Sequence, residues 1–201
     1  MSSSPHSASY QSFRNLPPLA GLATFAAAQA PGLSVEACVN RLKRLHWSFR
    51  RLHQIFVHRL VSEPVYELKM AFSLHSHYCA EHAAALRARV AEMREPPLGL
   101  DHVPDAALDL FFDEVLSAPD TAALLAGIYR YALPALLDAF ESYAAATNPL
   151  VDHPSLRVCR FALLEVREME AYGRRAVLLA ERGRQAGEGS SRRRSGPSDR
   201  A

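Results

Sequence analysis

Two histidines that could bind a metal ion lie seven residues apart, within the stretch HSHYCAEHAAALR that begins at His75. His75 and His82 both fall on apolar positions of a helical pattern, so we expect their side chains to face the core. Glu81 stands beside His82. A buried imidazole needs a metal ion, a reacting group or a hydrogen-bonding neighbour, and the stretch predicts one of these three.

Carboxylates that could meet these histidines lie in the last periodic segment of the chain. Glu165 and Glu168 are three residues apart, so they share one side of a helix. A carboxylate among apolar neighbours is costly to keep ionised unless a histidine, an arginine or a cation pairs with it. The inward-facing pattern that we predict for this helix consists of Val158, Phe161, Glu165, Glu168, Tyr172 and Leu179.

Imidazoles and carboxylates at similar depth in a helical protein are suited to iron, manganese or zinc. Tyr78 and Tyr172 are the candidate catalytic residues, each as a proton or electron donor beside the metal. A metal-free network of histidine–carboxylate hydrogen bonds, or a pocket for a small molecule, would use the same residue types. The predicted metal ligands are His53, His75, Glu81, His82, Glu165 and Glu168.

Helices must position these residues, because alanine, leucine and arginine are frequent and β-branched residues are scarce. The first two long helices are separated only by a tight turn at Pro64, and the last two by a short link. The central connection is long, and Pro134 is expected to kink the helix that follows it. The pattern predicts helices over 35–61, 64–94, 106–116, 120–146 and 155–182.

Short links make antiparallel neighbours, so this layout predicts two helical hairpins joined by a long crossover that contains a short helix. The fold class is therefore all-α, in the form of a ferritin-like up-down four-helix bundle. We expect this domain to cover residues 16–182. The serine-rich segment 1–15 and the Arg/Gly/Ser-rich segment 183–201 have no apolar pattern, and we expect both to be disordered.

Composition argues against several classes of function. The net charge of +2 gives no reason to expect nucleic acid as a partner. Three cysteines without a pairing pattern are typical of a reducing compartment, so we expect a cytoplasmic protein. We find no run of the ~18 to 20 apolar residues that a membrane span needs, and expect no membrane partner.

Several motifs resemble bacterial ferritin-like-domain proteins, over about residues 35–180. They are Glu67-Leu68-Lys69, His75, Ala80-Glu81-His82-Ala83, Leu86-Arg87, residues 144–150 (AAATNPL), and the acidic last helix from Leu163 to Gly173. The resemblance implies the ferritin-like fold and carries no agreed reaction. In that family position 78 is often acidic and position 169 is often His or Gln, whereas this chain has Tyr78 and Met169.

Two functional hypotheses follow. The first is an iron- or manganese-dependent oxidoreductase with a His/Glu site inside the bundle. The sequence contains no Glu-x-x-His pair, and this absence argues against the di-iron site that four-helix bundles usually carry. The alternative is a metal-free bundle whose His/Glu network stabilises the fold, and which acts by association. In that case we expect a homodimer, with no cofactor and with the alanine-rich helix faces available for packing.

Overall fold

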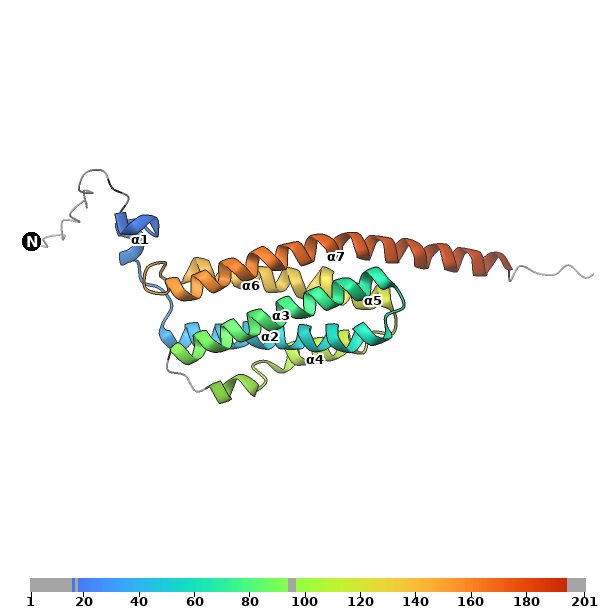
Figure 1. The fold of residues 1–201 in the computed structure, drawn as a ribbon, viewed down its shortest axis with the longest axis horizontal. Helices are drawn as coiled ribbons and strands as arrows, with labels where there is room; N and C mark the ends of the chain where they lie inside the picture. The colour runs from blue at the N-terminus through green and yellow to red at the C-terminus, as the bar shows by residue number, and fades with distance from the viewer. Residues whose placement is uncertain (1–15, 17, 94–96, 195–201) are drawn as a thin grey trace, which may run out of the picture.

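The computed structural model describes residues 16, 18–93 and 97–194, and within these ranges every regular element is helical (Figure 1). The all-α prediction is confirmed. The predicted disordered segment 1–15 lies outside the described residues, and so does the part of the segment 183–201 from residue 195 onward. The α-helices are α1 (Phe25–Gln29), α2 (Val35–Ser62), α3 (Tyr66–Glu92), α4 (Ala106–Leu116), α5 (Thr121–Leu125), α6 (Leu133–Ala146) and α7 (His153–Arg194).

The first hairpin is formed by α2 and α3, which pack along each other for their whole length (Figure 1). The Ser34 side chain accepts a hydrogen bond of 3.2 Å from the Ala37 N–H, and so caps the first turn of α2. Apolar residues of α2 recur at alternating spacings of four and three, and all of these positions are buried, since this spacing keeps one stripe of the helix facing inward. They are Cys38, Leu42, Leu45, Phe49, Leu52 and Phe56.

The helix predicted over 120–146 is interrupted by a π-helix, η4 (Ala126–Ala132), between α5 and α6. The Leu133 N–H donates to the Ile128 carbonyl oxygen, five residues back, instead of four. Pro134 explains this widening, because it has no N–H and its ring would collide with the carbonyl of an α-helical turn. The expected kink is therefore a π-helical segment, and it carries Tyr129 into the core at 1% exposure.

The last helix, α7, packs against α3, α5, η4 and α6. It runs on past Gly183, where the sequence predicted its end, and Figure 1 shows it extending beyond the end at which α2 turns into α3. A glycine inside a helix costs only about 1 kcal/mol, so flanking helix-forming residues can carry the helix through it.

The buried stripe of α7 is one residue away from the predicted one. Phe161 and Leu179 are 51% and 66% exposed, so they do not face the core. Two stripes with the same spacing run side by side here, and the one with small residues is buried because it allows a closer helix approach. The buried positions are Cys159, Ala162, Val166, Met169, Gly173 and Val177.

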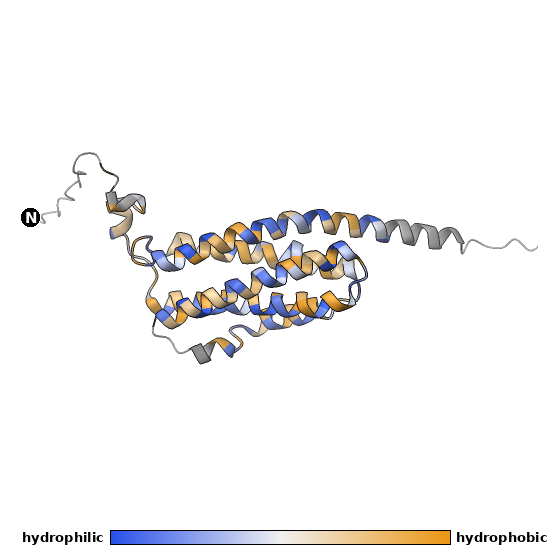
Figure 2. Cartoon of the chain, in the orientation of Figure 1, coloured by the Kyte–Doolittle hydropathy of each residue, from blue (hydrophilic) through white to orange (hydrophobic). Residues whose placement is uncertain are grey.

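The crossover contains a short 3₁₀-helix, η3 (Pro97–Asp101), and then α4, which packs on α2. The predicted helix over 106–116 is confirmed. Ion pairs attach this segment to α2, with Arg44 2.6 Å from Asp105 and Arg50 2.6 Å from Asp101. Figure 2 shows hydrophobic and hydrophilic residues alternating along the long helices, as expected where one side of each helix is buried.

The stretch Thr121–Ala146 is long and apolar enough to span a membrane, with a mean hydropathy of 1.3 over its most apolar window. The requirement for an uninterrupted apolar run predicts no such stretch, because Arg130, Asp138 and Glu141 break the run here. Half of that window is buried inside the array of helices. A core helix has the same composition, so length and hydropathy alone are weak grounds for a membrane assignment.

Candidate functional site

His75 is buried as predicted, at 4% exposure, and its partner is a tyrosine from the π-helix. Its Nδ1 lies 2.7 Å from the Tyr129 hydroxyl. The Phe56 and Tyr172 rings meet the imidazole edge-on, with centroid distances of 5.6 and 5.5 Å. Burial lowers the pKa of His75 to about 4 and raises the pKa of Tyr129. The pair is therefore neutral near pH 7, and the imidazole can accept the tyrosine proton in a hydrogen bond.

Tyr129 is held against the backbone of α7 at Gly173. A Cβ atom at position 173 would collide with the Tyr129 ring. This contact connects the π-helix, α3 and α7 around one buried histidine. Glycine in the middle of a strongly helical segment is the signal that could have indicated it, because such a glycine often marks a close approach.

His82 is also buried, at 5% exposure, and joins α3 to α7 through Glu165. Its Nε2 lies 2.7 Å from Glu165 Oε2, although the ring N–H is not aimed at that oxygen. The Phe49 ring covers the imidazole at a centroid distance of 5.0 Å. Burial lowers the pKa of His82, while the Glu165 carboxylate opposes this shift. The predicted meeting of a histidine and a carboxylate therefore occurs at this pair.

The other predicted ligands lie elsewhere. His53 is half-buried and its Nδ1 lies 3.0 Å from the Ser76 carbonyl oxygen, to which it can donate. Glu81 and Glu168 are exposed, and Tyr78 packs at the edge of the core. Glu168 is outside because the buried stripe of α7 is displaced by one residue from the predicted one.

A metal ion needs several donor side chains around one point, usually His, Cys, Asp or Glu. Within residues 16, 18–93 and 97–194, no three His, Cys, Asp or Glu side chains gather in a way that could hold an ion. His82 and Glu165 alone fall short of the ligand set of an iron pair. Iron or manganese binding stays a prediction.

The buried histidines predict an acid-sensitive fold. Burial lowers the pKa of both His75 and His46 to about 4, whereas the ordinary value is 6.5. Below pH 6.5 the unfolded chain binds protons that the folded chain does not, so stability is full above this pH and falls toward pH 4. Each histidine contributes a slope of up to about 1.4 kcal/mol per pH unit.

Urea unfolding at several pH values between about 7 and 5 measures this slope, which is set by proton uptake. His75→Asn should reduce the slope, while His58→Asn, at an exposed position of α2, should leave it unchanged. Equal slopes in the wild type and the His75 variant would show that His75 is not held neutral by burial.

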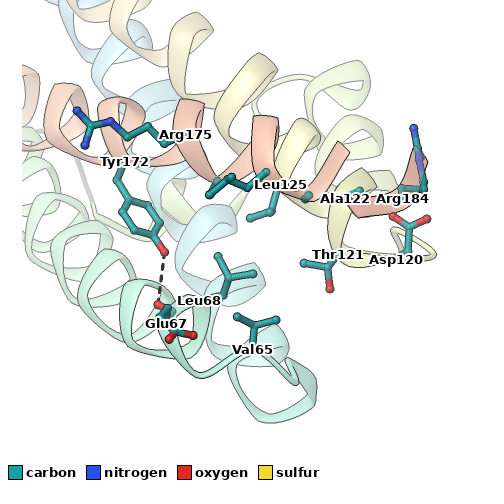
Figure 3. A pocket seen from close by; sticks show the side chains of 13 residues that line it. Val65, Glu67, Leu68, Asp120, Thr121, Ala122, Leu125, Tyr172, Arg175 and Arg184 are labelled. Atoms are coloured by element: carbon teal, nitrogen blue, oxygen red, sulfur yellow. Dashed lines mark hydrogen bonds between the residues drawn. The ribbon is translucent and has the colours of Figure 1, made fainter. Parts of the chain in front are cut away.

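A pocket of about 850 Å³ lies at the end of the array where α2 turns into α3 (Figure 3). Tyr172 forms one wall, and its hydroxyl donates a 3.4 Å hydrogen bond to the Glu67 carbonyl oxygen. The His75–Tyr129 pair lies behind this tyrosine, since the Tyr172 ring contacts both residues. The apolar lining includes Val65, Leu68, Ala122, Leu125, Leu179 and Ala180.

A second polar cluster, which the sequence did not indicate, surrounds Asp152 at the opposite end of the array. Asp152 is 6% exposed and accepts hydrogen bonds from Tyr143 (2.6 Å), Thr147 (2.9 Å) and Ser155. Arg89 of α3 forms an ion pair with it at 3.2 Å. The carboxylate therefore has partners from α3, from α6 with the turn after it, and from α7. An aspartate just before a helix start is the signal that could have marked it as a cap.

No protein-family model, curated protein or solved structure matches the chain.

Proposed function

We propose that the chain is a ferritin-like up-down four-helix bundle that acts by association with another protein and has no resident metal. Its four helices would be α2, α3, α7 and the stretch α5–η4–α6, with α4 on the crossover. The buried histidines would then hold the helices in register, and the surface would carry the function. Exposed apolar side chains near the α2–α3 turn support association, since Val61, Tyr66 and Leu179 are 83%, 69% and 66% exposed.

The observation that carries this proposal is the direct pairing of the two inward-facing histidines. His75 pairs with Tyr129 and His82 with Glu165, at 2.7 Å in each case. The Tyr129 hydroxyl satisfies His75 Nδ1, and the Glu165 carboxylate lies beside His82 Nε2 as a charge partner, so each imidazole has a protein group where an ion would otherwise stand. The contacts join α3 to η4 and α3 to α7, which is the role of a network that fixes how hairpins dock.

Elemental analysis of protein expressed with added iron and manganese tests the proposal. We expect well under about 0.1 metal ion per chain, because no complete ligand set surrounds His82 and Glu165. Glu168→Gln is the matched control for Glu165→Gln, because Glu168 was predicted as a ligand but lies exposed. Stoichiometric metal that Glu165→Gln removes and Glu168→Gln retains would establish the alternative, an iron- or manganese-dependent oxidoreductase.

A further inference from the structure

The pocket beside Tyr172 is a groove, and each of its ends has one acid and one arginine. Glu67 and Arg175 lie near Tyr172, and Asp120 and Arg184 lie at the other end (Figure 3). None of the ion pairs in the described part of the chain joins these four side chains. Asp120 uses Oδ1 to cap α5, where it accepts the Ala123 N–H at 2.7 Å, and this leaves its second oxygen for another donor.

The floor between these charges is apolar and only partly covered. Leu179 lies midway between Arg175 and Arg184 on α7, lines the groove and is 66% exposed, while Leu178, which is 52% exposed, lines a neighbouring cavity. The helix continues to Arg194, beyond the end of its own array (Figure 1). Exposed leucines between charged residues, on a helix that runs past its own core, are typical of a surface that another protein covers.

The volume of about 850 Å³ lies within the range of ligand pockets, so the placement of the polar groups has to distinguish a small molecule from a protein. Pockets for small ligands present a few polar groups that converge on the ligand. Here the Tyr172 hydroxyl donates to the Glu67 carbonyl oxygen, and the Thr121 hydroxyl donates to the Glu63 carboxylate at 3.0 Å. The charged groups stand at the two ends of an apolar strip, and this arrangement matches a helix that carries charges on either side of a leucine.

We infer that a second copy of this chain covers the groove, with its α7 antiparallel to the first α7 around a twofold axis near Leu179. Arg175 and Arg184 are about 13.5 Å apart along the helix at 1.5 Å per residue. Rotation about the axis brings Arg184 of the second copy to Glu67, and Arg175 of the second copy to Asp120. Each copy then supplies an ion-pair partner to the acids of the other copy, as a self-complementary twofold interface requires.

This inference rests on one part of the proposed function, namely that the protein acts by association. It adds that the partner is a second copy of the chain. Light scattering after size exclusion, with the full chain up to about 100 µM, measures the oligomeric state. We expect a dimer. Glu67→Arg and Arg184→Glu should each weaken the dimer by at least about tenfold, because both place like charges opposite each other. The double variant Glu67→Arg/Arg184→Glu should recover the dimer, since it restores opposite charges.

Arg160→Glu is the matched control, because it makes the same charge change at an exposed position in the first half of α7. Circular dichroism melting of each variant separates loss of the dimer from loss of the fold. A monomeric wild type, dimeric single variants or a double variant that stays monomeric would each overturn the inference, and so would a monomer that binds an apolar dye in the groove. A metal-loaded protein that passes the charge-swap test would refute the proposed function and leave this interface standing.

Discussion

Gly173→Ala is expected to lower the free energy of unfolding by about 3 kcal/mol, although alanine is the better helix former by about 1 kcal/mol. The reason is the contact between the α7 backbone and the Tyr129 ring, which a Cβ atom would enter. Gly173 is buried, and the Tyr129 hydroxyl is held in its hydrogen bond with His75. Neither the helix nor the ring can therefore move without disturbing the His75–Tyr129 pair.

Gly183→Ala is the matched control in the same helix. Gly183 is exposed, and a Cβ atom there would have no neighbour within 4 Å. The intrinsic preference for alanine should then stabilise the protein by about 0.5 to 1 kcal/mol. Urea unfolding followed by circular dichroism compares the two variants directly. Equal effects at both positions would mean that Tyr129 does not pack against Gly173.

A double-variant cycle assigns the effect to this contact. Tyr129→Leu removes the ring, so adding Gly173→Ala to it should cost at least about 1 kcal/mol less than Gly173→Ala alone costs in the wild type. Additive effects would place the cause of the destabilisation elsewhere in α7.

Local signals predicted the helices well, because each is specified by residues close together in the sequence. The side chains of Ser34 and Asp120 cap α2 and α5, as is usual for these residue types, and the apolar spacing within 120–146 matches the side of that segment that is buried. The same side stays buried through the π-helix, since Tyr129 and Leu133 are both buried. His75 and His82 were placed inward for the same reason, and both are buried.

The partners of these histidines could not be predicted, because they depend on how each helix is rotated against its neighbours. A one-residue error in the stripe of α7 was enough to turn Glu168 to the surface, while Glu165 stayed within reach of His82. Tyr129 lies on the buried side that the spacing indicates, but its partner His75 comes from another helix, and the spacing within one segment does not say which residues of two helices meet. The iron or manganese ligand set depended on all of these rotations at once.

Asp152→Ala is expected to destabilise the protein by about 3 to 5 kcal/mol, the usual range for removing one partner from a buried ion pair. Arg89, whose side chain is 14% exposed, would keep only the exposed Glu92 as a carboxylate partner, and the hydroxyls of Tyr143 and Thr147 would lose their acceptor. Each buried donor left without a partner adds its own desolvation penalty. Because these donors come from different helices, the loss should lower the stability of the whole fold.

The matched control is Asp101→Ala, which removes an aspartate from another ion pair with an arginine. Asp101 lies 2.6 Å from Arg50, but the two side chains are 58% and 35% exposed, so this change should cost less than about 1 kcal/mol. Chemical denaturation of both variants gives the comparison. Arg89→Met combined with Asp152→Leu should cost less than the sum of the single changes, since no charge is then left alone in the interior. If Asp152→Ala were as mild as Asp101→Ala, water would have to reach Asp152, and the cluster would not tie α3, α6 and α7 together.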